Sequence, residues 1–113
     1  MSGRVNKHEA FLDLLSSTNP IQRKALIRTA SEEQLRSVCE CALNILRQQV
    51  HLSPKQIAEL RKHRSLVYKL ADRSIPIPRK RKLLEQSGGV LPALLVPVLS
   101  SVLGAVASKI FGG

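Results

Sequence analysis

Apolar residues recur at intervals of three and four positions in two long stretches of this chain. The repeat keeps roughly a 3.6-residue period from Leu35 to Val50 and again from Ile57 to Ala71. That spacing places apolar side chains on one face of an α-helix. An earlier apolar set is expected to complete a modest core: Leu12, Leu15, Ile21, Ala25 and Leu26. The pattern predicts an all-α fold.

Capping residues mark three helix starts. Asn19, Ser31 and Ser53 are each followed three positions later by Gln, and a proline follows directly after Asn19 and Ser53. The cap side chain accepts a free backbone N–H, the Gln can reach back to the cap, and Pro suits the first helical position. We therefore expect helices over about 7–16, 20–29, 32–50 and 54–73. Residues 1–73 are predicted to form a small bundle of three or four helices.

The sequence changes character after residue 73. Pro76 and Pro78 disfavour a helix before and at their own positions, so residues 74–89 are expected to be a basic Pro/Gly linker. From Ser87 to Ser108 there are 22 residues without a charge. A helix there would be apolar nearly all round and must be buried in something. Residues 90–113 are therefore predicted to form an apolar tail helix.

Positive charge is concentrated in the middle of the chain. The net charge is +10, and residues 55–82 hold ten Lys or Arg against two Asp or Glu. Such a stretch favours phosphate backbone, acidic lipid or an acidic protein as partner. Aromatic residues are scarce, which disfavours single-strand binding by base stacking and leaves double-stranded DNA as the expected partner. The predicted nucleic-acid contacts are Lys55, Arg61, Lys62, Arg64, Lys69, Arg73, Arg79, Lys80, Arg81 and Lys82.

Residues that would support catalysis or metal binding are few. Cys39 and Cys41 are two positions apart, so on a helix they point in different directions, and no second Cys pair completes a zinc site. We expect Cys39 to be buried and Cys41 to be partly exposed. The three histidines lie far apart, and there is no nucleophile elbow or phosphate-binding Gly loop. The sequence predicts no enzyme, no metal site and no cofactor.

The apolar tail has two physical uses. Its length would span a bilayer core of about 30 Å, although Pro92 and Pro97 make it a mediocre spanning helix. Alternatively it docks on a protein partner or on a second copy of the chain. The residues expected to make either contact are Val90, Leu91, Leu94, Leu95, Val98, Leu99, Val102 and Leu103.

The stretch from the basic cluster into the tail resembles the C-terminal part of the precursor of adenovirus core protein X, also called mu. In that family an Arg-rich condensing segment precedes Gly-Gly and an apolar run with spaced prolines. The matching residues are Arg79 to Lys82, Gly88-Gly89, Leu91-Pro92, Leu94-Leu95, Pro97 and Leu103 to Val106. The resemblance implies a minor late protein of an adenovirus-like DNA virus or of a virus-derived transposon.

The resemblance also implies a processing site. In the family, a viral protease cleaves at the glycine pair, so Gly88 and Gly89 are the expected position here. The family has Met, Ile or Leu two residues before the glycines, whereas this chain has Gln86. The helical region at residues 1–73 has no counterpart in the short adenovirus precursor.

Three functions follow from these patterns. The first is a viral structural protein that binds and helps condense double-stranded DNA through a basic arm, with its tail docked on capsid or other virion proteins or forming a homo-oligomer. It would reside in the virion and in the host nucleus, and Arg79 to Lys82 would also suit an import signal. The second is a tail-anchored or membrane-disrupting protein that uses residues 90–111 in lipid. The third is a helical interaction adaptor.

Overall fold

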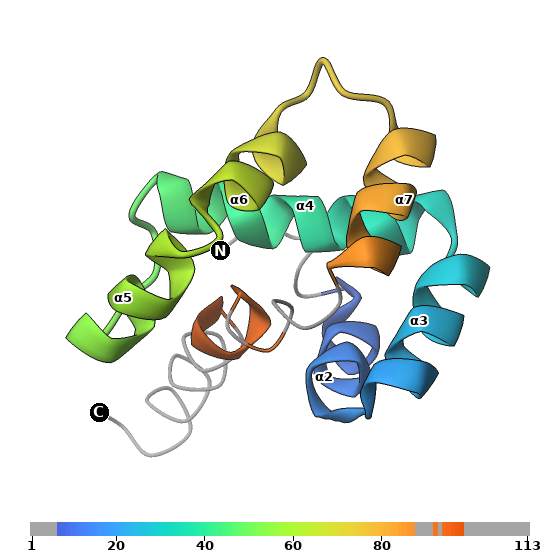
Figure 1. The fold of residues 1–113 in the computed structure, drawn as a ribbon, viewed down its shortest axis with the longest axis horizontal. Coiled ribbons are helices and arrows are strands. Elements are labelled where there is room, and N and C mark those ends of the chain that lie inside the picture. The colour runs from blue at the N-terminus through green and yellow to red at the C-terminus, as the bar shows by residue number, and fades with distance from the viewer. Residues whose placement is uncertain (1–6, 88–91, 93, 99–113) are drawn as a thin grey trace.

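The chain is all-helical in a computed structural model that describes residues 7–87, Pro92 and residues 94–98. This confirms the predicted fold class. Figure 1 shows the elements in order, with a further helical turn at residues 94–98. The helices are α2 (Glu9–Ser17), α3 (Pro20–Thr29), α4 (Glu32–Leu46), α5 (Pro54–Arg61), α6 (Arg64–Ala71) and α7 (Ile77–Gln86).

The three predicted helix starts are confirmed. Asn19 accepts the backbone N–H of Gln22 at 2.8 Å and begins α3. Ser31 and Ser53 each form a complete capping box that begins α4 and α5. In the second box the Ser53 hydroxyl accepts the Gln56 N–H at 3.2 Å, and the Gln56 side-chain oxygen accepts the Ser53 N–H at 2.8 Å. These contacts satisfy backbone donors that a helix start otherwise leaves unpaired.

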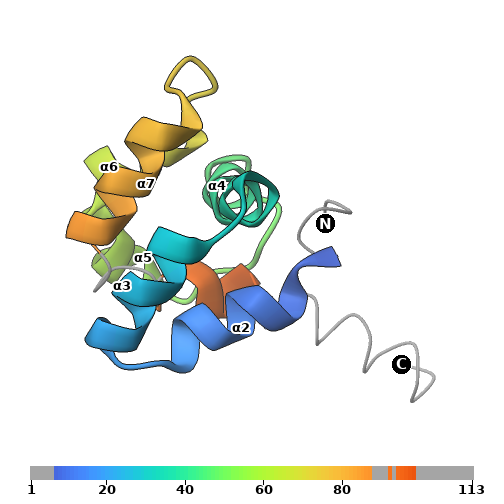
Figure 2. The same ribbon diagram turned by 90° about the vertical axis from the view of Figure 1, so that its right-hand side faces the viewer.

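Helix α4 lies at the centre of the molecule. Its apolar stripe is buried, including Leu35, Val38, Ala42 and Ile45. Helix α6 packs along it, and α2 and α7 also contact it. Figure 2, which looks nearly along α4, shows α6 and α7 on one side and the turn at residues 94–98 on another, between α4 and α2. The core is therefore organised around one helix whose sides are covered by different elements.

Helix α4 ends earlier than predicted. We expected it to reach residue 50, but it ends at Leu46 in a Schellman motif. The N–H of Gln48 donates to the carbonyl of Ile45, and the N–H of Gln49 donates to the carbonyl of Asn44. Gln48 has φ 57°, a left-handed conformation that a glycine usually supplies. No glycine marks this position, so the sequence gives no signal that the helix ends here. Val50 is buried, although it lies beyond the end of α4.

The helix predicted over residues 54–73 is also wrong, because it is two helices. The N–H groups of Lys62 and His63 donate to carbonyls only three residues back, which tightens the chain and ends α5. Helix α6 then starts at Arg64 in a new direction along α4 (Figure 1). Arg61 and Arg64 would be neighbours on one continuous helix, and like charges at that spacing are destabilising.

The predicted linker at residues 74–89 is wrong for Ile77–Gln86, which form helix α7. Pro76 caps this helix and Pro78 occupies its first turn, where the missing N–H costs nothing. The apolar residues Ile77 and Leu84 are buried, and α7 packs on α3, α4 and α6. The two prolines therefore start a helix instead of preventing one, and α7 is part of the bundle.

The core also differs from the predicted set on α3. Leu12 and Leu15 are fully buried as expected, but Ile21 is 84% exposed and Ala25 is exposed. Helix α3 instead turns Ile27 and the stem of Arg23 inward. Arg23 Nε donates to the carbonyl of Leu15 at 2.8 Å, which fixes α3 against the end of α2. The buried face of α3 is therefore the one that carries Arg23 and Ile27.

Candidate nucleic-acid interface

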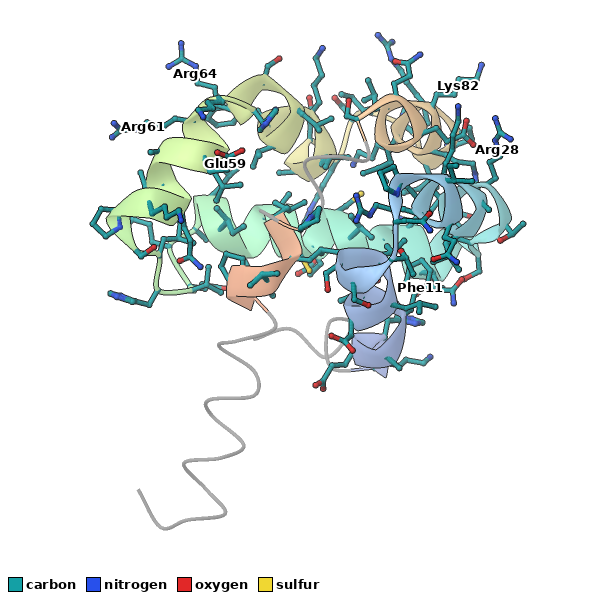
Figure 3. All side chains as sticks on the ribbon, turned by 60° about the horizontal axis from the view of Figure 1, so that its bottom comes forward. Phe11, Arg28, Glu59, Arg61, Arg64 and Lys82 are labelled. Carbon is teal, nitrogen blue, oxygen red and sulfur yellow. The ribbon has the colours of Figure 1, made fainter. Side chains whose placement is uncertain are left out.

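The predicted cations of α5 and α6 lie on the protein surface. Arg61, Lys62 and Arg64 flank the junction of the two helices, and Lys69 follows one turn later; all four are exposed. Lys55 is exposed in the first turn of α5. Figure 3 shows Arg61 and Arg64 extending away from the bundle, with Glu59 beside them.

Only one of these cations forms an ion pair among the described residues. Lys62 Nζ lies 3.4 Å from a carboxylate oxygen of Glu59, and both side chains are largely exposed. An exposed pair of this kind contributes about 0–1 kcal/mol, so it leaves Lys62 available to a stronger anion. Arg61, Arg64 and Lys69 have no carboxylate within 4.0 Å in the part of the chain that the structure describes. Their charges therefore face water.

The basic cluster from Arg79 to Lys82 is divided by helix geometry. Arg79 and Lys82 are exposed on the outer side of α7, whereas Lys80 is only 4% exposed and Arg81 is partly buried. An import receptor that approaches the folded chain would meet only Arg79 and Lys82. These four residues lie on a helix and not in the predicted linker, because α7 packs against the bundle and directs Lys80 and Arg81 inward.

Arg81 connects two helices instead of extending into solvent. Its Nη1 atom donates toward the carbonyl oxygens of Ile27, Arg28 and Ala30, at 2.9, 3.2 and 2.8 Å. These carbonyls end α3 and lack partners within that helix. A cation at this position also complements the negative end of the helix dipole. Arg81 thus joins α7 to α3 across more than fifty residues of sequence.

Arg73 and Asp72 lie in the loop between α6 and α7, and both are exposed. Ser74 donates to the Asp72 carboxylate from its hydroxyl at 2.6 Å and from its backbone at 2.9 Å. These two hydrogen bonds lower the pKa of Asp72, so this carboxylate is ionised in neutral solution. It is one of two acidic residues within the basic stretch, the other being Glu59.

We define the basic face as the exposed cations of α5, α6, the following loop and α7. Eight of the ten predicted nucleic-acid contacts belong to it: Lys55, Arg61, Lys62, Arg64, Lys69, Arg73, Arg79 and Lys82. Figure 3 shows Arg61 and Arg64 near one end of the molecule and Lys82 near the other, all directed away from α2. Arg28, which the sequence reading did not single out, lies beside Lys82, with its Nε 3.7 Å from Glu85.

Only some of the residues predicted to make tail contacts lie in the part of the chain that the structure describes. Leu94, Leu95 and Val98 are fully buried and belong to the hydrophobic core of the bundle. They dock on the chain's own helices, on the side of α4 away from α6 and α7 (Figure 2). The other predicted tail contacts and the possible processing site lie outside the described residues: Val90, Leu91, Leu99, Val102, Leu103, Gly88 and Gly89.

The cysteines are two buried thiols. Cys39 is buried as expected, but the prediction that Cys41 is partly exposed is wrong, because it lies on the buried side of α4. Burial raises the pKa of both thiols, and that of Cys41 reaches about 12. Among the residues that the structure describes, no group of three potential ligands is placed to hold a metal ion. No helix within that part of the chain is long and apolar enough to cross a membrane.

Comparisons with known proteins give no relative for this chain. A scan against protein-family models, a search of curated proteins and a search of solved structures each found no match.

Proposed function

We propose that this protein is a structural nucleic-acid-associated protein that binds the phosphate backbone of double-stranded DNA through the basic face. The observation that carries the proposal is the exposure of eight cations on consecutive elements, with Glu59 and Asp72 as the only acidic residues in the same stretch. Each phosphate that a Lys or Arg neutralises releases condensed counterions, which drives association without base readout.

The basic face is held on folded helices, which affects how it would bind. Arg79 and Lys82 are fixed on α7 because Arg81 and the buried residues Ile77 and Leu84 anchor that helix. Cations on a preformed surface lose less conformational entropy on binding than cations on a flexible arm. We therefore propose that the protein docks on the duplex as a rigid basic surface, and that condensation comes from several copies bridging duplexes.

The resemblance to the adenovirus core protein X precursor supports a core-like role in a virion. In that proposal the protein meets DNA in the host nucleus and is packaged with it. Capsid or other virion proteins, or a second copy of the chain, are the proposed partners of the tail. The first helical turn of the tail, at Leu94, Leu95 and Val98, is already occupied by the bundle, so such partners would bind residues beyond it.

The membrane alternative has a structural cost. A tail-anchored or membrane-disrupting protein would place residues 90–111 in lipid. Leu94, Leu95 and Val98 would then leave the core in which they are fully buried. Burial of a leucine or valine side chain is worth about 1.5–3 kcal/mol each, so their removal would destabilise the bundle by several kcal/mol. Because these side chains are buried in the bundle, we propose DNA binding before membrane insertion.

Two matched triple variants test the proposal. One changes Lys69, Arg79 and Lys82 of the basic face to Gln. The other changes Lys7, Lys24 and Arg47 to Gln; these are also exposed but lie outside α5, α6 and α7. Both variants lose the same charge, so a difference between them reports position and not net charge.

The measurement is fluorescence anisotropy of two labelled duplexes of unrelated sequence at fixed salt. We expect the basic-face variant to bind both duplexes at least about tenfold more weakly than the control variant, because each lost phosphate contact removes part of a sequence-independent attraction. Equal losses in the two variants would contradict a localised interface. A loss confined to one duplex sequence would contradict backbone recognition.

A further inference from the structure

A cavity of about 440 Å³ lies between α4 and the pair of helices α6 and α7. Three cations line this cavity, namely Arg36, Arg73 and Lys80. The wall also includes Glu40 and Cys39 from α4. Apolar side chains complete the lining: Leu43, Leu70, Ala71, Ile75, Pro76 and Ile77.

Lys80 is the unusual member of this lining. It is 4% exposed, and in the described residues no carboxylate lies within 4.0 Å of its ammonium group. Its charge acts on the thiol of Cys39 on α4 and on the carboxylate of Asp72 in the α6–α7 loop. Lys80 lines the cavity together with Cys39, and the neighbours of Asp72 in the chain, Ala71 and Arg73, line it as well. A buried charge without an ion-pair partner is costly, and an anion that enters the cavity would relieve that cost.

The other charges around the cavity add to its positive character. Arg73 is exposed and stands at the rim. Arg36 is held by Glu32 at 2.7 Å and by Glu33 at 3.9 Å, and neither of these carboxylates lines the cavity. Because Arg36 is already paired, Lys80 and Arg73 are the two lining cations that an anion in the cavity would contact.

The N-terminus of α7 also favours an anion in the cavity. Pro76 and Ile77 line the cavity, and they form the N-terminus of a ten-residue helix whose cap makes no side-chain hydrogen bond. The positive end of that helix dipole therefore faces the hollow. The Cys39 thiol stays protonated in neutral solution because burial raises its pKa, so it does not repel an anion.

We propose that this cavity is a binding site for a single phosphate monoester group, held by the Lys80 ammonium with Arg73 at the rim. The dianion of a phosphate monoester carries about −1.5 to −2 at neutral pH, which complements the charges of Lys80 and Arg73. The apolar wall formed by Leu43, Leu70 and Ile75 would contact the organic part of the ligand. Arg73 belongs both to this site and to the basic face, whereas Lys69, Arg79 and Lys82 do not line the cavity.

The first test uses inorganic phosphate as the probe and thermal unfolding of the full chain as the readout, with chloride at matched ionic strength as reference. Lys80→Met removes the charge and keeps the apolar stem, and Lys24→Met is the control on the exposed side of α3. We expect phosphate to raise the midpoint of the native chain and of the control, and to bind Lys80→Met at least about tenfold more weakly, the loss typical of a charged hydrogen bond. Equal phosphate shifts in all three proteins, or none, would overturn the proposal.

A second pair of variants covers the case in which Lys80→Met does not fold. Arg73→Gln alters an exposed residue at the rim, and Arg47→Gln is its control at the end of α4. Weaker phosphate binding in Arg73→Gln than in Arg47→Gln supports the site, and equal binding overturns it.

The source of the phosphate is distinguished by two further probes. Short duplexes with a 5′-phosphate and with a 5′-hydroxyl differ only in a terminal monoester. A preference of the native chain for the phosphorylated duplex that disappears in Lys80→Met assigns the group to a nucleic-acid end. Binding of inorganic phosphate without that preference assigns it to a small phosphorylated molecule. Loss of both signals overturns the site and leaves the DNA-binding proposal unaffected, because the basic-face variants do not touch Lys80.

Discussion

Replacing Arg81 tests whether the basic cluster is part of the folded bundle. In the structure its Nη1 atom lies 2.9, 3.2 and 2.8 Å from the carbonyl oxygens of Ile27, Arg28 and Ala30. These contacts connect α7 to the C-terminal end of α3. Arg81→Met keeps the apolar stem of the side chain and removes the guanidinium group, so the variant isolates the contribution of the hydrogen bonds and charge.

The magnitude follows from the geometry. One nitrogen carries two hydrogens, so the three short distances amount to about two hydrogen bonds at a time. A hydrogen bond from a charged donor contributes about 1.5–3 kcal/mol, and the helix dipole adds about 0.3–1 kcal/mol. The three carbonyls are partly accessible to water, which replaces some of the loss. We therefore expect Arg81→Met to lower the free energy of unfolding by about 2 kcal/mol, which corresponds to a midpoint shift of roughly 8–16 °C.

The assay is thermal and urea unfolding followed by circular dichroism. Arg79→Met is the matched control, because Arg79 is exposed on the same helix two residues away. It should change stability by less than about 0.5 kcal/mol. If Arg81→Met and Arg79→Met unfold at the same temperature, then α7 does not rely on this contact for its place in the bundle.

Three further predictions concern other parts of the fold. Leu94→Ala should destabilise the chain by about 2–5 kcal/mol, whereas Val96→Ala, at a 45% exposed position, should stay within about 0.5 kcal/mol; equal effects in urea unfolding would remove the tail turn from the core. Gln48→Gly should stabilise by about 0.5–1 kcal/mol, because glycine relieves the left-handed strain at φ 57°, and a lower midpoint would contradict this. The pKa of Cys41 is raised in the folded chain to about 12. The stability that the protonated Cys41 thiol contributes is therefore fully present below the ordinary thiol pKa and is lost as pH rises toward 12. Over that range Cys41→Ala should lose less stability than the native chain, as measured by urea unfolding.

Local chemistry in the sequence was sufficient to locate the helix starts. Ser31 and Ser53 with their glutamines act within four residues, so the capping boxes formed as predicted. The ends of the helices were harder to predict from the sequence. The Schellman motif at Gln48 uses a residue with no preference for the left-handed region. No glycine marks this helix end, so the sequence carries no local signal for it.

The candidate site was predicted in composition but not in geometry. Charge counting identified the basic stretch, and eight of its ten cations are exposed. Counting charges did not show that the prolines before Arg79 start a helix. It therefore did not show that this helix directs Lys80 and Arg81 inward. The signal that was available is the spacing of Ile77, Lys80 and Leu84, which lie three and four positions apart on one helical face. The stripe did not lead to a predicted helix because Pro76 and Pro78 favoured a linker.

The salt dependence of DNA affinity tests the central claim most directly. For the native chain, the logarithm of the association constant should fall linearly with the logarithm of salt concentration, with a slope of about −0.9 for each phosphate contacted. The variant in which Lys69, Arg79 and Lys82 are changed to Gln should reduce the magnitude of that slope by about 2.7. The control variant at Lys7, Lys24 and Arg47 should leave the slope unchanged. A slope near zero for the native chain, or equal slopes in the two variants, would contradict a phosphate-binding face on α5, α6 and α7.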